Sequence, residues 1–391
     1  MKKLTLILIA VLGVFVWSCE SDDTADIIIE NNTGGGGGGT TPTSSNIGGT
    51  QTADLTLEIG QEYILTEALI MSAGTTLTIP AGVVIKANPG AGVYIAIAQD
   101  ATIIAEGTSS SPIVLTSNVA TPAAGDWGGL IVLGRAPINS VAGGNATSTS
   151  EIGGLPYGGS NTGDNSGIIR YLRVEYSGGA ADASSENNGF SFYGVGNGTT
   201  IEFIQAFEGK DDGIEFFGGT VNASNLSVIG AQDDSVDWTE GFSGTLTDVY
   251  IEHRVEHDKG IEADGFNTDI GNNSSPVFWS KPIVNNLTII GRGSATGNEA
   301  VRLRAGTQGL FTNVLIQGFE EAFDLDAEGS EPTGQGVIDG DLRVTDVTFV
   351  DVLVKMKNDT GVVFDESDFI FGDGNGTGTD YNSWNGGWTR N

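Results

Sequence analysis

The chain has 391 residues, 60 of them glycine, with 50 acidic and 17 basic side chains and a formal net charge of −33. This length is enough for a sizeable core, and the low proline and lysine content argues against a wholly disordered chain. A charge this negative repels phosphate groups, so we do not expect nucleic acid as a partner. Asparagine, glycine, threonine, isoleucine and valine dominate, which favours an all-β protein with many short strands and turns.

The N-terminus predicts export and lipidation. Residues 1–18 hold two lysines and then an apolar run of about 14 residues, which is too short to span a bilayer and is typical of a secretory signal. Cys19 follows directly, and as the one cysteine of the chain it cannot form an internal disulfide. The phrase VWSC resembles the lipobox of bacterial lipoproteins, which implies cleavage before Cys19 and attachment of lipid to that residue.

The residues directly after the cysteine suggest a second targeting signal. They are Glu20, Ser21, Asp22 and Asp23. This stretch resembles the export signal of surface-exposed lipoproteins of Bacteroidota, which implies anchoring in the outer membrane on the extracellular side; a random acidic tether is the alternative. A Gly/Ser/Thr-rich segment at 30–52 predicts a flexible linker. The sequence thus divides into a signal peptide (1–18), a tether (19–53) and a folded body (54–391).

The folded body repeats itself. Short apolar runs alternate with period two from Leu55 onward, which indicates half-buried strands between tight turns. One series consists of apolar pairs two residues apart, beginning at Leu172, Ile204, Leu226, Val249, Leu287, Val314 and Val347. A second series has spacings of 22, 25, 40 and 22 and consists of Ile214, Val236, Ile261, Val301 and Phe323.

A unit of about 22 residues fits three short strands and three turns, which is one coil of a right-handed parallel β-helix. Leucine-rich repeats would need a recurrent leucine framework that is absent, and propeller blades are about 40 residues long. Phrases such as QDATIIAEGTSSSPIVLTS, GDWGGLIVLGRAPIN and GNEAVRLRAGTQG resemble a family of uncharacterised secreted or lipid-anchored proteins found mainly in Bacteroidota. The resemblance covers residues 55–391 and implies a pectin-lyase-like β-helix; it implies no activity.

An acidic phrase recurs on successive coils, as KDDGIE at 210–215, QDDSVD at 232–237 and HDKGIE at 257–262. Equivalent residues of adjacent coils lie about 4.8 Å apart, so Asp212, Asp234 and Lys259 are expected in one column. A second column, expected to point to solvent by strand alternation, holds Glu215, Asp237 and Glu262. Carboxylates this close repel one another, raise one another's pKa, or require a cation.

A first hypothesis for these acids is catalysis. Their order resembles that of polygalacturonase-type glycoside hydrolases, which implies one carboxyl as general acid, another as base for water, and a basic group that grips a sugar acid. The residues that match are Asp212, Asp233, Asp234, His257, Arg302 and Arg304. The flanking residues depart from the pattern, since Lys210 and Asp211 replace Asn-Thr and Arg302 is expected about two coils beyond His257.

Two other hypotheses remain open. Stacked carboxylates suit Ca²⁺, and the candidate ligands are Asp211, Asp212, Asp233 and Asp234. In the C-terminal phrase DGNGTGTD, three further candidates alternate with glycine as at the start of a calcium loop: Asp373, Asn375 and Thr377. Alternatively the acids are structural, because an Asp that accepts backbone N–H groups recurs at the same turn of each coil, and Lys259 would neutralise part of the column.

The function that these observations favour is a binding platform on the cell surface. Its expected partner is a polysaccharide or an outer-membrane protein of an uptake or adhesion assembly. The alternative is a polysaccharide hydrolase or lyase that uses the region of Asp212 and Asp234. Ca²⁺ is the one cofactor that the sequence suggests, and it specifies no oligomeric state.

Overall fold

The structure is a computed structural model that describes residues 44–140, 147–181, 185–268, 276–327 and 331–391. The strands are β1 (Ser44–Gln51), β2 (Leu55–Thr56), β3 (Glu62–Met71), β4 (Thr76–Pro80), β5 (Val84–Ala87), β6 (Ile95–Ile97), β7 (Thr102–Glu106), β8 (Ile113–Ser117), β9 (Leu130–Leu133), β10 (Ser148–Thr149), β11 (Pro156–Tyr157), β12 (Gly167–Glu175), β13 (Phe190–Tyr193), β14 (Thr200–Phe207), β15 (Ile214–Phe217), β16 (Ala223–Ile229), β17 (Val236–Thr239), β18 (Thr245–Glu252), β19 (Ile261–Asp264), β20 (Ile283–Ile290), β21 (Glu299–Arg304), β22 (Gly309–Asp326), β23 (Leu342–Asp359) and β24 (Ile370–Asp373). The helices are α1 (Thr333–Asp339), α2 (Glu366–Phe369) and the 3₁₀ helix η1 (Tyr381–Ser383).

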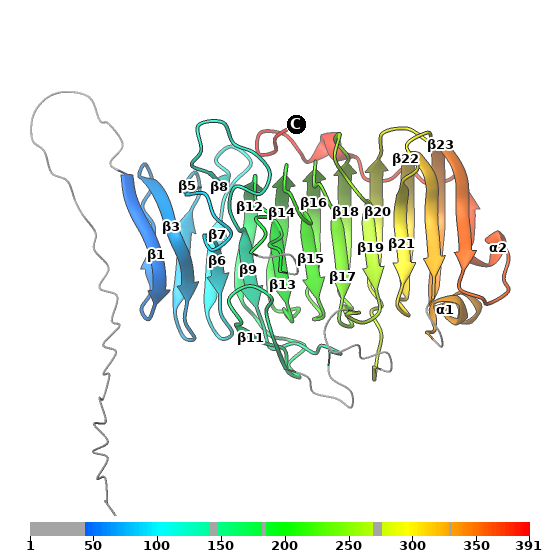
Figure 1. Ribbon diagram of the computed structural model, residues 1–391, viewed down its shortest axis with the longest axis horizontal. Helices are drawn as coiled ribbons and strands as arrows, with labels where there is room; N and C mark the ends of the chain where they lie inside the picture. Colours follow the sequence, from blue (N-terminus) through cyan, green and yellow to red (C-terminus); the bar gives the residue numbers. More distant parts are fainter. Residues whose placement is uncertain (1–43, 141–146, 182–184, 269–275, 328–330) are drawn as a thin grey trace, which may run out of the picture.

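The chain forms a right-handed parallel β-helix, as the repeat predicts. Its coils stack along one axis, so that the sequence runs from one end of the elongated body to the other (Figure 1). The strands of the solenoid pair in parallel, and the short β10–β11 pair beside it is antiparallel. All the members of both apolar series lie in register: Leu172, for example, pairs with Ile204, and Ile214 with Val236. Their side chains fill one continuous core inside the coils.

Seven long strands turn a corner between two faces of the coil. At the corner one residue per coil has a positive φ, including Asn225, Asp248, Asn286 and Asn313. Asn and Asp tolerate this left-handed conformation better than other side chains that carry a Cβ. The amide of Asn286 donates to Asp248 at 3.0 Å, and that of Asn313 donates to Asn286 at 2.9 Å. The corner is thus fixed by a ladder of side chains that bond from coil to coil.

The third face of the coil carries the acidic phrases. It consists of β6, β9, β13, β15, β17, β19, β21 and the C-terminal parts of β22 and β23, and we call its outer side the acidic face. At its N-terminal end, apolar side chains of these strands pack against described residues that follow β9, within 134–140 and 147–157. That second core includes Leu133, Ile138, Tyr157, Tyr193 and Phe217. Part of this face is therefore covered rather than open to solvent.

The first coil begins inside the predicted tether. β1 (Ser44–Gln51) pairs in parallel with β3, although the sequence predicts a flexible linker to residue 52 and a folded body from residue 54. The stretch SSNIGGTQ lacks the alternating apolar residues that signal a strand. Its glycines permit close packing instead, because a Cβ on Gly48 would lie 2.6 Å from the Cγ of Glu67.

The C-terminal segment runs back over the solenoid, from the last coil to the middle coils (Figure 1). The Tyr381 ring stacks on Tyr250 with 3.8 Å between centroids. The backbone N–H of Arg390 donates to the Gln205 side chain at 2.7 Å, and its guanidinium pairs with Glu175 at 2.8 Å. This strap ties distant coils together. Among the described residues no helix is both long and apolar enough to cross a membrane.

Candidate functional site: the acidic face

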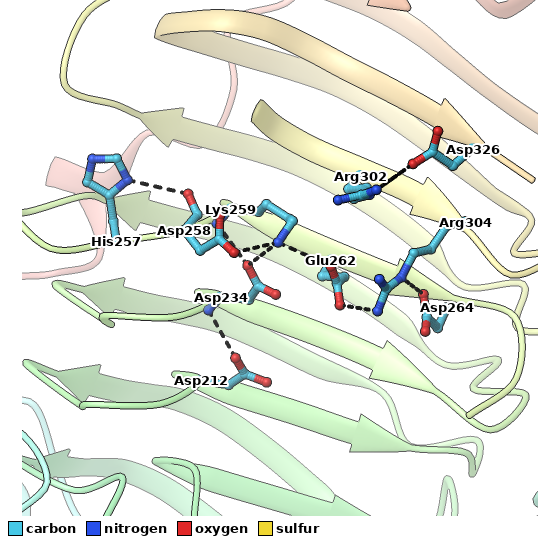
Figure 2. A network of polar contacts seen from close by, with 10 residues as sticks. All are labelled: Asp212, Asp234, His257, Asp258, Lys259, Glu262, Asp264, Arg302, Arg304 and Asp326. Carbon is cyan, nitrogen blue, oxygen red and sulfur yellow. Dashed lines mark hydrogen bonds and ion pairs between the residues drawn. The ribbon is translucent and has the colours of Figure 1, made fainter. Parts of the chain in front are cut away.

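Two of the repeated acids hold the backbone of the next coil. Asp212 Oδ1 accepts the backbone N–H of Asp234 at 3.0 Å, and Asp234 Oδ1 accepts that of Lys259 at 2.8 Å (Figure 2). Both aspartates are almost fully buried, with 8% and 5% of their surface exposed. A buried N–H without an acceptor is costly, so the same solution recurs at the same turn. This geometry is the one that the structural hypothesis predicts.

Lys259 occupies the place of a third acid and neutralises its neighbours. Its Nζ lies 2.6 Å from Asp258, 3.2 Å from Glu262 and 3.7 Å from Asp234 (Figure 2). Burial opposes the charge of Lys259, but Asp234 and Glu262 outweigh burial and raise its pKa above the ordinary value. The lysine therefore stays protonated and binds two coils together.

The two arginines of the catalytic hypothesis are committed to carboxylates of the protein. Arg304 pairs with Glu262 at 2.6 Å and with Asp264 at 2.7 Å, while Arg302 pairs with Asp326 at 2.6 Å (Figure 2). Arg302 lies in register with Glu262, in the coil directly after it, so the prediction that Arg302 lies about two coils beyond His257 is wrong. Because β19 and β21 pair directly, the extra residues between them in the sequence do not add a coil.

Apart from Asp234, the acids next to this network have no lysine or arginine partner among the described residues. One carboxylate oxygen from each member of a group lies within 4.8 Å of the others, and the groups are Asp212–Glu215–Asp237, Asp212–Asp233–Asp234 and Glu186–Asp211–Asp233. Among the described residues no cation lies within 4.0 Å of Asp211, Asp212, Glu215, Asp233 or Asp237. The internal segments outside the description contain no lysine or arginine.

Burial and mutual repulsion both act on this unpaired group. Burial raises the pKa of Asp211 to about 8, with further contributions from Glu186 and Asp233. Burial also raises the pKa values of Asp212 and Asp237 well above their usual range, and neighbouring carboxylates add to the effect. At neutral pH these carboxyl groups hold protons or require a cation.

Strand alternation predicts that the second column points to solvent, but its side chains are largely covered. Glu215 is 9% exposed, Asp237 is half-buried, and Glu262 keeps only 13% of its side chain exposed. The side-chain amide of Asn188 donates to Glu215 at 2.5 Å. Strand alternation correctly assigns these side chains to the outer side, but it carries no information about the loops that pack over that side.

His257 lies at the edge of an open depression. This depression of about 650 Å³ is lined by Lys210, Gln232, Val255, Glu256, His257, Thr296 and Asn298. It lies at the turns that precede β15, β17, β19 and β21, directly beside Asp211 and Asp233 in the sequence. The His257 ring stacks on buried His253 with 4.5 Å between centroids, and its Nδ1 lies 3.4 Å from the carbonyl oxygen of Asp258.

The C-terminal calcium candidates are held by three different partners. Asp373 pairs with Lys355, the Asn375 amide donates to Asp346 at 3.4 Å, and the Thr377 hydroxyl donates to Asn313 at 3.1 Å. These contacts fasten the start of the C-terminal strap to the last coils. The lipidation residue Cys19 and the export residues Glu20, Ser21, Asp22 and Asp23 lie outside the described residues.

Sequence analysis missed a further acidic group, formed by Glu299, Glu321 and Asp324. A signal for it was available. Glu299 and Glu321 each lie two positions before a member of the second apolar series, Val301 and Phe323, and so occupy equivalent positions of adjacent coils.

Comparisons with known proteins bear on the fold. The model of a family described as "Pectate-lyase like beta helix domain" matches residues 49–389. No curated protein matches the chain. Among solved structures, the chain is similar to the enzymatically active domain of tailspike protein 2 of bacteriophage CBA120, with 10% identity and a TM-score of 0.23. The alignment covers 76% of this chain and 38% of the tailspike chain.

Proposed function

Since the chain belongs to the family of pectate-lyase-like β-helix domains, we propose that its elongated body is a glycan-binding platform without catalytic activity. The observation that carries the proposal is the open depression beside Asp211 and Asp233. Its volume of about 650 Å³ falls within the usual range of small-ligand sites, about 300–1,000 Å³. Gln232, Thr296 and Asn298 offer amide and hydroxyl groups there, which is the chemistry that binds sugar hydroxyls.

The net charge of the protein restricts the class of glycan that we expect it to bind. A net charge of −33 slows the approach of polyanions, so the proposed ligand is a neutral glycan rather than a polyuronate. The contacts of the residues that resemble those of polygalacturonases also favour binding over hydrolysis. Asp212 and Asp234 are buried and accept backbone N–H groups, and Arg302 and Arg304 are paired with carboxylates. None of these four groups is free to act on a substrate in this arrangement.

The test is a binding titration of the purified protein against a panel of neutral and acidic polysaccharides. Replacing both Gln232→Ala and Asn298→Ala removes two amides from the depression and should weaken glycan binding by roughly 10- to 30-fold, since each lost hydrogen bond costs about 1 kcal/mol. Gln335→Ala on α1 removes an exposed amide at another place and should leave binding unchanged. Equal affinities of the two variants, or no ligand across the panel, would contradict the proposal.

The alternative function is a polysaccharide hydrolase or lyase, and one observation supports it. Burial raises the pKa of Asp211 to about 8, so this carboxyl holds a proton at neutral pH and could donate it. The partly exposed Asp233 beside it would be the base. If the same polysaccharide panel yields reducing ends or unsaturated sugars, Asp233→Asn should abolish them and the exposed neighbour Asp258→Asn should not. Product release of this kind would replace the binding proposal.

We further propose that the protein is anchored through Cys19 in the outer membrane and faces the outside, with an outer-membrane protein of an uptake or adhesion assembly as a possible second partner. The support is the lipobox-like phrase and the acidic residues after it. Protease treatment of intact cells should degrade the protein, and Cys19→Ala should release it from the membrane fraction. A protein that resists the protease on intact cells would contradict the surface location.

A further inference from the structure

A second acidic group lies farther along the solenoid, outside the site described above. Glu299 of β21 and Glu321 of β22 are directly opposite each other in register, and Asp324 of β22 lies opposite Arg302. One carboxylate oxygen from each of the three acids lies within 4.8 Å of the others. Like charges directly opposite on neighbouring strands destabilise a sheet. A positive charge or bound protons must therefore offset the repulsion between these three carboxylates.

The protein itself compensates only in part. Each of the three side chains has one carboxylate oxygen that is sealed from solvent and has no hydrogen-bond partner, namely Glu299 Oε2, Glu321 Oε2 and Asp324 Oδ1. Asp324 is only 2% exposed, so its Oδ1 cannot be satisfied by bulk water. An unsatisfied buried oxygen of a charged group costs more than about 1–3 kcal/mol. Lys357 reaches Glu321 Oε2 only as an ion pair at 3.6 Å, so Glu299 Oε2 and Asp324 Oδ1 are the oxygens that indicate a missing partner.

The nearby cations do not fill this role. Lys357 lies 3.2 Å from Asp324 Oδ2, which is the other oxygen of that carboxylate, and 3.6 Å from Glu321 Oε2. Its side chain is 40% exposed and also pairs with Asp359 at 3.2 Å, so it sits at the rim of the group. Arg302 is committed to Asp326. The Glu299 side chain makes no hydrogen bond or ion pair with any described residue.

We infer that Glu299, Glu321 and Asp324 form a binding site for a divalent cation, with Ca²⁺ the ion that fits best. Oxygens bound to one Ca²⁺ lie about 2.3–2.6 Å from it, so ligands on opposite sides are about 5 Å apart. The separation of at most 4.8 Å matches this sphere. Three carboxylates can supply up to six oxygens. Mg²⁺ keeps several waters, which the sealed oxygens would displace.

The ion would have a structural consequence. Glu299 belongs to one coil and Glu321 and Asp324 to the next, so a bound Ca²⁺ joins two coils of the solenoid, as Lys259 does in the preceding coils.

The test compares two variants of the full chain that each lose one negative charge. Glu299→Gln removes a ligand, and Glu320→Gln removes the adjacent carboxylate that does not belong to the group. Calcium titration calorimetry should show one Ca²⁺ fewer per chain for Glu299→Gln than for wild type and Glu320→Gln. Thermal unfolding should show a Ca²⁺-dependent rise in Tm for wild type that is smaller in Glu299→Gln. In EDTA, Glu299→Gln should be at least as stable as wild type, because it removes repulsion.

Two results would overturn the inference. One is a wild-type protein that binds no Ca²⁺ at all, and the other is a Glu299→Gln variant with the wild-type number of Ca²⁺ ions and the wild-type Tm shift. Ions bound near Asp212 and Asp233 would persist in Glu299→Gln, so the difference between the proteins isolates this site. Glu321→Gln provides a second, independent variant if Glu299→Gln does not fold. Failure of this test would leave the proposed glycan site untouched, since the depression contains none of the three acids.

Discussion

The acidic face contains two regions that repeat the same sequence phrase but differ in whether lysine and arginine side chains offset the repulsion between its carboxylates. In the ion-paired region, Lys259 and Arg304 bind the carboxylates of Asp234, Glu262 and Asp264. The unpaired region lies one or two coils earlier and consists of Asp211, Asp212, Glu215, Asp233 and Asp237. Its acids have neighbours of the same charge and no lysine or arginine within 4.0 Å among the described residues. The backbone is the same in both, since Glu215, Asp237 and Glu262 follow one another in register.

The difference shows which part of the acidic phrase serves the fold. The aspartates that accept backbone N–H groups recur in both regions, so folding explains them. The register of the coil does not depend on a lysine or arginine at this position, because the unpaired region has the same register with none within 4.0 Å among the described residues. Buried Asp211, half-buried Asp233 and exposed Glu186 are therefore the acids that folding does not explain. They adjoin the depression at 210, 232 and 257, where we place ligand binding.

The largest expected effect comes from removing the cation of the ion-paired region. Lys259→Met keeps the length of the side chain but leaves Asp234 and Glu262 buried without their partner, which should lower the free energy of unfolding by about 3 kcal/mol or more. Urea denaturation measures it. Lys86→Met, which removes a partly exposed pair with Glu62, is the matched control and should cost less than about 1 kcal/mol. Equal losses in the two variants would show that the paired region is not held by its ions.

Removing a charge from the unpaired region should have the opposite sign. The pKa of Asp211 is about 8 in the folded protein and about 3.9 in an unfolded chain, so the folded state binds this proton more tightly. This contribution to stability is full below pH 4 and is lost as the pH rises to 8. Asp211→Asn should therefore raise the free energy of unfolding by up to a few kcal/mol at pH 9, relative to its effect at pH 5, because each pKa unit between the two states is worth about 1.4 kcal/mol. A pH-independent effect, measured by urea denaturation in EDTA, would contradict this.

The repeat made most of the fold predictable. Spacings of 22 to 40 residues placed Ile214, Val236, Ile261, Val301 and Phe323 in one column, and the register confirms every step. The reason is that a solenoid packs each coil against its sequence neighbour, so a local pattern determines contacts between coils. Strand β1 was not predicted, because glycines rather than alternating apolar residues let it approach β3.

The candidate site was less predictable, because it depends on contacts that the repeat does not encode. The column of Asp212, Asp234 and Lys259 followed from the spacing. The burial of Glu215 did not, since it depends on packing from outside the coils. The ion pairs of Arg304 with Glu262 and Asp264 depend on the direct pairing of β19 with β21, which the 40-residue spacing between Ile261 and Val301 did not predict.

The smallest expected effect separates the exposed rim of the ion-paired region from its buried centre. Asp258 lies 2.6 Å from Lys259 but keeps 49% of its side chain exposed, so water and salt screen the pair. Asp258→Asn should change the free energy of unfolding by less than about 1 kcal/mol, and the change should shrink further at high ionic strength. Denaturation at two salt concentrations measures both. A loss as large as that of Lys259→Met would mean that the short contact with Asp258, and not the buried contacts with Asp234 and Glu262, holds the two coils together.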